Sequence, residues 1–232
     1  MRSLTTRDMT EDRVRAAYDT VAAAYERQFR AELDDKPLER GLLGAFCNMT
    51  PQGVIADIGC GPGHITGFLA ARREQVVGFD LSPRMIALAR RHNPALSFAV
   101  ASMTDLPCPD GSFAGVVAMY SIIHLDSAQR VRAFGEFART LRLDGTLLVS
   151  FHVDGPGLGP GDVNHLSTFL GHSVDMDGYF LDPTVVTREL VGNGFRVEAR
   201  LDREPIAGIE FASRRCYVLG RRAVRSSHGP RA

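Results

Sequence analysis

The sequence has 232 residues, of which 44% are hydrophobic, and this is enough to bury one substantial core in a single α/β domain. Acidic and basic side chains balance at 27 each, so no overall electric field draws the chain toward nucleic acid or an anionic membrane. A small or neutral partner fits this balance better. The sequence leaves the oligomeric state open, and a homodimer is compatible with it.

The cysteines and the apolar segments give no sign of export or membrane insertion. The four cysteines are widely spaced and form no Cys-x-x-Cys pair, so neither a disulfide framework nor a thiolate metal site is predicted. No uncharged apolar stretch reaches membrane-spanning length, and Met1 to Glu11 lacks an apolar signal core. We therefore expect a cytoplasmic protein with reduced cysteines and no membrane partner.

Two amphipathic helices are predicted at the start of the chain. Apolar residues recur at helical spacing from Thr10 to Tyr25, and Glu11 lies in the first turn, where the helix dipole favours an acid. A second helix is expected from about Leu38 to Met49. We interpret residues 10–50 as a helical cap.

Beyond the cap, short apolar runs alternate with helical segments, which is typical of βαβ units around a parallel sheet. Ser82-Pro83 and Asp182-Pro183 each combine a capping residue with a first-turn proline and so predict two helix starts. The predicted strands are Val54–Ile58, Gln75–Asp80, Leu96–Val100, Phe113–Met119, Gly145–Phe151, Phe195–Leu201 and Arg214–Gly220.

Residues 152–182 are rich in glycine, proline and polar side chains, and we predict that they form a long lid insertion. Their histidines and aspartates match no metal-ligand spacing, so a polar lid is favoured over a metal site and no metal is predicted. The whole chain is interpreted as one domain, with a cofactor-binding core at 51–151, the rest of the sheet at 183–220 and a disordered tail at 221–232.

The run Asp57-Ile58-Gly59-Cys60-Gly61-Pro62-Gly63 follows the first predicted strand, and its glycines let the backbone turn sharply beside a ligand. A dinucleotide fingerprint needs a third glycine where His64 stands, and the Asp57 carboxylate would repel a pyrophosphate. S-adenosylmethionine (SAM) has no phosphate and carries an ammonium and a sulfonium, which the same carboxylate attracts. The run therefore favours a cationic cofactor without phosphate.

Asp80 ends the second predicted strand, where a carboxylate can accept hydrogen bonds from both ribose hydroxyls. NAD enzymes share this role, so Asp80 does not discriminate between cofactors. Two alternatives therefore stay open beside a SAM-dependent enzyme. One is a NAD-dependent oxidoreductase, and the other is a SAM-binding protein that transfers no methyl group.

Four segments in a fixed order resemble the class I SAM-dependent methyltransferases, from about residue 10 to residue 220. They are Ile55-Ala56-Asp57-Ile58-Gly59-Cys60-Gly61-Pro62-Gly63, Gly78-Phe79-Asp80-Leu81-Ser82-Pro83-Arg84-Met85, Asp105-Leu106-Pro107-Cys108-Pro109-Asp110-Gly111-Ser112-Phe113 and Leu141-Arg142-Leu143-Asp144-Gly145-Thr146-Leu147-Leu148. Within this family the chain resembles the small-molecule branch, whose tyrosine-containing amino-terminal helix closes over the cofactor.

The resemblance implies a doubly wound α/β fold with a mostly parallel, seven-stranded Rossmann-like sheet whose last strand is antiparallel. It also implies methyl transfer from SAM to oxygen, nitrogen or carbon of a small metabolite, with S-adenosylhomocysteine as the other product. We expect such a metabolite to belong to bacterial secondary metabolism.

The resemblance also implies which residues bind the cofactor. Asp57 and the glycines would line the methionine part, Asp80 would hold the ribose, and the adenine would lie between Leu81 and Met103. Asp105 is the only acid near the adenine edge, so the partner of the adenine amine stays open. The full predicted cofactor set is Tyr18, Tyr25, Asp57, Gly59, Cys60, Gly61, Gly63, Asp80, Leu81, Ser82, Met85, Ala101, Ser102, Met103 and Tyr120. For Tyr18 and Tyr25, ordinary core packing is an equal alternative.

His124 follows the fourth predicted strand, at the edge of the sheet where doubly wound folds bind ligands. Histidine can accept a proton from an acceptor hydroxyl or amine, so His124 is the candidate base, with loop positioning as the alternative. Because a sulfonium is a good leaving group, alignment alone can supply much of the acceleration. The predicted substrate-binding residues are Ser121, His124, Tyr179 and Arg214, and a solvated strand end is the alternative for Arg214.

Overall fold

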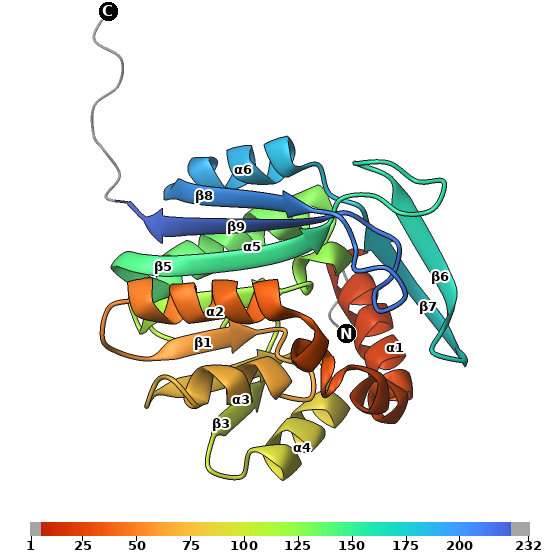
Figure 1. Cartoon of the computed structure of the whole chain (residues 1–232), viewed down its shortest axis with the longest axis horizontal. Coiled ribbons are helices and arrows are strands. Elements are labelled where there is room, and N and C mark those ends of the chain that lie inside the picture. Colours follow the sequence, from red (N-terminus) through yellow and green to blue (C-terminus); the bar gives the residue numbers. More distant parts are fainter. Residues whose placement is uncertain (1–5, 224–232) are drawn as a thin grey trace, which may run out of the picture.

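A seven-stranded sheet forms the centre of the computed structural model, which describes residues 6–223 (Figure 1). Its strand order is β3-β2-β1-β4-β5-β9-β8, and β9 runs antiparallel to both of its neighbours. This confirms the predicted doubly wound sheet with an antiparallel last strand. The strands are β1 (Ile55–Ile58), β2 (Val76–Asp80), β3 (Ser97–Val100), β4 (Phe113–Met119), β5 (Leu141–His152), β8 (Phe195–Arg203) and β9 (Arg215–Arg222).

Helices cover both faces of the sheet, because its central strands are apolar on both sides. In β1, Ile55 packs into the cluster under α2 and α3, whereas Ala56 and Ile58 pack into the cluster under α5 and α6. The side chains of Ser82 and Asp182 accept hydrogen bonds from the first turns of α4 and α6, as their sequences predict. These helices are α2 (Pro37–Met49), α3 (His64–Ala70), α4 (Pro83–His92), α5 (Ser127–Thr140) and α6 (Pro183–Gly192).

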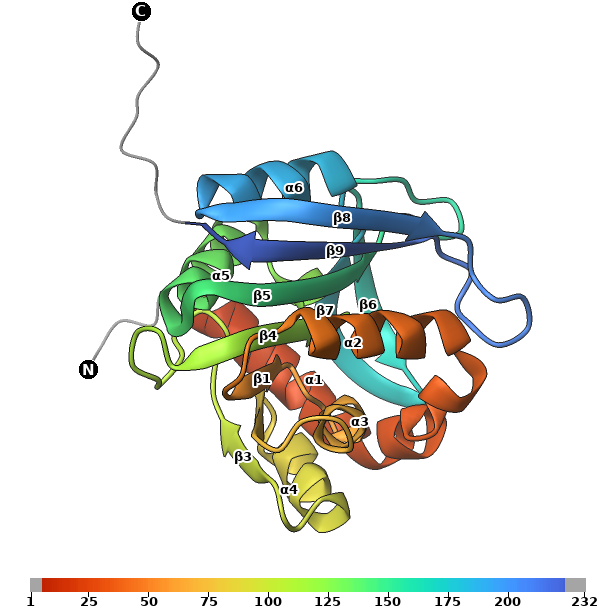
Figure 2. The ribbon, with the colours of Figure 1, turned by 60° about the vertical axis from the view of Figure 1, so that its left-hand side comes forward.

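The first helix, α1 (Thr6–Phe29), lies across the carboxyl ends of the parallel strands, beside the hairpin formed by β6 and β7 (Figures 1 and 2). This hairpin consists of Val163–Phe169 and His172–Tyr179, and β7 packs against α1. Its two-residue turn, Leu170-Gly171, has positive φ at both positions, which defines the twist-matched hairpin turn. The predicted lid insertion therefore contains an ordered hairpin.

Several boundaries differ from the sequence-based expectations. Strand β9 continues to Arg222, which pairs with Phe195, so Arg221 and Arg222 belong to the sheet and not to a tail. The rest of the predicted tail, residues 224–232, lies outside the described residues, as do residues 1–5. Strand β5 begins at Leu141, before the predicted start at Gly145. Among the helices of residues 6–223, none is long and apolar enough to cross a membrane.

A capping box fixes the start of α5, directly after the short 3₁₀ helix η2 (Ile122–His124). The Asp126 carboxylate accepts a hydrogen bond of 2.8 Å from the backbone N–H of Gln129, and the Gln129 side chain accepts one of 3.1 Å from the Asp126 N–H. This reciprocal pair holds the loop that carries His124.

Removing this cap should destabilise the fold measurably. We expect Asp126→Ala to lower the free energy of unfolding by about 1 kcal/mol, because the orphan N–H of Gln129 loses its acceptor. Urea denaturation followed by circular dichroism measures this change, with Asp35→Ala at an exposed site as the control. A variant whose denaturation midpoint equals that of the control would contradict the assignment.

Candidate active site

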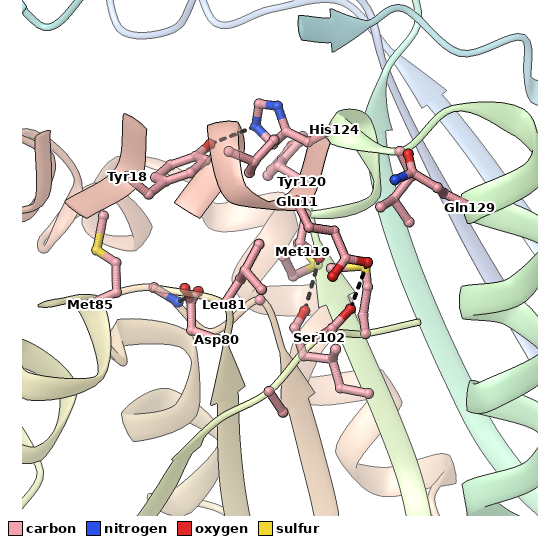
Figure 3. A pocket seen from close by; sticks show the side chains of 18 of the residues that line it. Glu11, Tyr18, Asp80, Leu81, Met85, Ser102, Met119, Tyr120, His124 and Gln129 are labelled. Carbon is pink, nitrogen blue, oxygen red and sulfur yellow. Dashed lines mark hydrogen bonds between the residues drawn. The ribbon is translucent and has the colours of Figure 1, made fainter. Parts of the chain in front are cut away.

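Two adjoining cavities lie at the carboxyl ends of β1, β2 and β4, beneath α1. They share the lining residues Tyr25, Gly59, Gly61, Met119 and Tyr120 and so form one elongated site. The larger cavity, seen in Figure 3, is further lined by Thr10, Glu11, Val14, Tyr18, Ile58, Asp80, Leu81, Met85, Ala101, Ser102, Met103, Ser121, His124, Leu125 and Gln129. The smaller is further lined by Glu32, Leu33, Lys36, Glu39, Asp57, Cys60, His64 and Ile65.

The glycine loop between β1 and α3 presents bare backbone to both cavities. Gly59 and Gly61 have φ of +76° and +53°, a region that residues with a side chain rarely adopt. A Cβ on Gly59 would lie only 2.2 Å from the Cβ of Ser121. The N–H of Gly61 donates to the Asp80 carboxylate over 2.8 Å, which ties the loop to the end of β2. Glycine is therefore required at position 59, because its positive φ and the close approach of Ser121 both exclude a side chain.

Two carboxylates stand at the ends of neighbouring strands, and of these Asp57 is buried and Asp80 half-buried. Asp57 lines the smaller cavity and accepts a hydrogen bond of 2.7 Å from the Thr66 hydroxyl, and Asp80 lines the larger cavity. Burial raises the pKa of both carboxyl groups to about 6, although each also accepts hydrogen bonds that oppose this effect. A cation or hydroxyl donors placed against these groups would stabilise their ionised forms.

The smaller cavity carries further charged groups, which come from the segment between α1 and α2. The ammonium of Lys36 lies 2.6 Å from one oxygen of Glu32, and the other oxygen of Glu32 lies 2.7 Å from Nε2 of His64. In Glu39, one buried carboxylate oxygen has no hydrogen-bond partner, and the same holds for Nδ1 of His64. This cavity is therefore suited to a ligand that carries both charged and hydrogen-bonding groups.

His124 is held in one tautomer by its two partners. Its Nδ1 lies 2.8 Å from the backbone carbonyl oxygen of Asp177, which can only accept, so Nδ1 carries the proton. Nε2 then accepts from the Tyr18 hydroxyl, 2.7 Å away (Figure 3). Burial lowers the pKa of His124 and raises the pKa of Tyr18, so both side chains are uncharged at neutral pH.

Aromatic rings from two segments roof the larger cavity. The ring of Tyr18 lies 5.9 Å from that of Tyr25, and both rings lie 6.4 Å from Phe169 on the hairpin. Tyr120 lies between the two cavities with φ of +52°. Its hydroxyl donates to the Glu39 carboxylate and lies 2.7 Å from the Tyr217 hydroxyl. The cap, the hairpin and the sheet therefore enclose the site together.

Most of the residues predicted from the sequence line one of the two cavities. The thirteen cofactor residues that do so are Tyr18, Tyr25, Asp57, Gly59, Cys60, Gly61, Asp80, Leu81, Met85, Ala101, Ser102, Met103 and Tyr120, and the substrate residues that do so are Ser121 and His124. The four that do not are Gly63, Ser82, Tyr179 and Arg214.

Packing and local hydrogen bonds account for three of these four positions. Gly63 begins α3, where a Cβ would approach Ala89 to 3.0 Å. Ser82 caps α4 and donates to Asp19 over 2.5 Å. Arg214 is exposed and forms a 2.5 Å ion pair with Asp154, as the solvated strand end would. Tyr179 ends β7 and lines neither cavity.

The sequence patterns missed the cavity residues on the cap. Val14 lies three positions after Glu11 and four positions before Tyr18, so the three residues share one face of α1. Helical spacing extended backward from Tyr18 would therefore have found Val14 and Glu11. No such signal exists for Glu32 and Lys36, which reach the smaller cavity from a 3₁₀ turn. Within residues 6–223, no group of three or more histidine, cysteine, aspartate or glutamate side chains is arranged to hold a metal ion.

A family model described as "Methyltransferase domain" matches residues 55–145, which span the glycine loop, both acids and the strand that precedes His124. This match indicates a methyltransferase domain in residues 55–145 of the chain. SAM is the cofactor of this family, and this domain fits it. Asp57 lines the smaller cavity, where its carboxylate could face the ammonium, Asp80 lines the larger, where it could accept the ribose hydroxyls, and Gly59 and Gly61 line both.

Curated relatives match part of this chain. A trans-aconitate 2-methyltransferase of Methylobacterium nodulans is 38% identical over 100 residues, which cover 41% of this chain and 36% of the relative. A demethylmenaquinone methyltransferase of Tropheryma whipplei is 30% identical over 143 residues, which cover 59% and 57%. The chain therefore spans between about a third and three fifths of these relatives' length.

Solved structures share the fold over most of this chain. The [4+2]-cyclase SpnF has a TM-score of 0.71 at 17% identity, covering 93% of this chain and 97% of its own. Geranyl diphosphate C-methyltransferase from Streptomyces coelicolor has a TM-score of 0.62 at 16% identity, covering 81% and 82%. At these identities the likeness concerns the fold alone.

The raised pKa of the two acids predicts how cofactor affinity depends on pH. Asp57 and Asp80 are partly protonated near pH 6 in the free protein, and the cofactor's ammonium and ribose hydroxyls favour the carboxylates. Binding therefore releases protons. We expect the affinity for S-adenosylhomocysteine to fall as the pH drops below 6, by up to roughly tenfold per pH unit for each acid, and to level off above it.

Isothermal titration calorimetry between about pH 5 and 7 measures this dependence. Asp57→Asn should bind more weakly and show a shallower slope, because one titrating group has been removed. An affinity that stays constant across this range would show that the acids do not titrate on binding.

Proposed function

We propose that this protein transfers the methyl group of SAM to oxygen, nitrogen or carbon of a small metabolite. The observation that carries the proposal is a single enclosed site that combines the cofactor acids and glycine loop with an uncharged Tyr18–His124 pair. The fold alone does not carry it, since a protein named as a [4+2]-cyclase shares that fold. The names of the relatives, which include trans-aconitate and demethylmenaquinone methyltransferases, support a small-molecule acceptor.

Bound SAM supplies an electrophilic methyl group on a good leaving group. Asp57 and the glycine loop hold the methionine end, and Asp80 fixes the ribose, so the chain aligns the methyl group for in-line attack. The Tyr18 hydroxyl accepts the proton of the acceptor atom while its own proton passes to Nε2 of His124. The carbonyl of Asp177 then stabilises the imidazolium through Nδ1.

We further propose that the acceptor belongs to secondary metabolism and that the protein works in the cytoplasm. A homodimer is compatible with the chain. Phe169 of the hairpin lies 6.4 Å from the rings of Tyr18 and Tyr25 over the larger cavity, which supports the role of the hairpin as a lid that excludes water.

Transfer of a tritiated methyl group tests the proposed function directly. The protein is incubated with methyl-labelled SAM and a panel of small carboxylic acids, phenols, amines and prenyl compounds. We expect label in an extracted product together with an equal amount of S-adenosylhomocysteine. Thermal stabilisation by S-adenosylhomocysteine without transfer to any acceptor would favour a SAM-binding protein with another role, and stabilisation by NADH alone would favour an oxidoreductase.

The Tyr18–His124 pair should matter for chemistry more than for cofactor binding. We expect Tyr18→Phe and His124→Gln each to lower kcat by roughly 100-fold on a hydroxyl acceptor, because the proton has no relay. The affinity for S-adenosylhomocysteine should stay within about threefold of the wild type. His172→Gln, at an exposed position of the hairpin outside both cavities, is the matched control and should retain full activity.

The same comparison separates the base from its alternative. If His124 only positions the loop after β4, His124→Gln would weaken cofactor binding, and Tyr18→Phe would turn over at the wild-type rate. That pattern would remove the pair from the mechanism.

A further inference from the structure

One end of the larger cavity carries a carboxylate that comes from the cap. Glu11, on α1, lines this cavity together with Ser102 and Met103 (Figure 3). Its Oε1 accepts hydrogen bonds from the Ser102 hydroxyl over 3.0 Å and from the Thr104 hydroxyl over 2.7 Å. Two donors from the segment after β3 therefore hold a carboxylate of α1 in place, at the rim of a cavity that the core alone does not close.

We propose that Glu11 is the group that recognises the exocyclic amine of the adenine, so that the cap and not the core selects the base. The proposal rests on the proposed function, because it requires SAM in this site with its ribose at Asp80. The nucleobase then lies between Leu81 and Met103, which both line this cavity, and its edge faces Ser102 and Glu11.

The other polar groups near this end are less suited to bind an amine. Asp105, the acid that follows in the sequence, is exposed and lines neither cavity. The side-chain oxygen of Gln129 accepts the backbone N–H of Asp126 in the capping box. The hydroxyls of Ser102 and Thr104 already donate to Glu11. Both hydroxyls donate to one oxygen, Oε1, and a carboxylate has about four acceptor directions, so these two hydrogen bonds do not exclude an amine donor.

This assignment predicts a specificity that a structural role would not produce. S-inosylhomocysteine differs from S-adenosylhomocysteine in having a ring carbonyl where adenine has its amine and an N–H where adenine has its unprotonated N1. A carbonyl oxygen at the position of the amine is repelled by a carboxylate. We expect the wild type to bind the inosine compound roughly 10 to 100 times more weakly, since a charged hydrogen bond is replaced by a repulsion. In Glu11→Gln the amide can either accept or donate, so the ratio should fall to within about threefold.

Calorimetric titration of both compounds into wild type, Glu11→Gln and Asp12→Asn tests the proposal. Asp12 is the neighbouring acid on α1, lines neither cavity and pairs with Arg15, so Asp12→Asn should keep the wild-type ratio. Equal binding of the two compounds by the wild type would overturn the proposal, and so would Glu11→Gln with an unchanged ratio, even if both affinities fall. Failure of the wild type to bind either compound would instead overturn SAM as the cofactor.

Discussion

The burial of two carboxylates at the ends of adjacent strands is the constraint on which the site depends. Asp57 and Asp80 lie in a low-dielectric environment, and burial moves the pKa of each upward to about 6. Two acids that are so close and so poorly solvated destabilise their ionised forms unless donors or a cation face them. The loop between β1 and α3 supplies part of this through the N–H of Gly61, and a cationic ligand is suited to supply the rest.

This constraint explains why the cap is built around polar contacts with the core. Asp19 on α1 accepts from the Ser82 hydroxyl and the Arg84 N–H, and Glu26 pairs with His92 at the other end of α4. Each contact joins α1 to the helix that follows Asp80. Such partly solvated pairs contribute little stability individually, so the position of α1 also depends on its buried apolar residues Ala17, Val21 and Ala22.

The sequence predicted those parts of the site that are local in the chain. The end of the strand, the acid and the glycine loop lie within the seven residues from Asp57 to Gly63, so their closeness in the sequence alone brings them together. Asp80 follows from the rule that parallel strands end at one edge of a sheet. Glu11 and Lys36 could not be placed in the same way, since their position depends on how α1 and the 3₁₀ turn dock onto the sheet. The hairpin was missed because β6 lacks the alternation of apolar and polar residues that predicts a strand. In β7 only Val174 and Met176 alternate with polar residues, and Met176 is buried through the docking of α1, which is not local in the chain.

The ionic network behind Tyr120 links stability to the shape of the site. Glu210 accepts two hydrogen bonds from Arg203, which hold its pKa at about 2 against the opposing effect of burial, and Arg203 also lies 3.3 Å from Glu39. Buried pairs of this kind recover little more than their own desolvation penalty. Their effect is to position Tyr120. Glu39 accepts a hydrogen bond from the Tyr120 hydroxyl and so holds this residue in a left-handed backbone conformation, which itself costs conformational free energy. The charged side chains therefore fix the ring of Tyr120, which lines both cavities of the site.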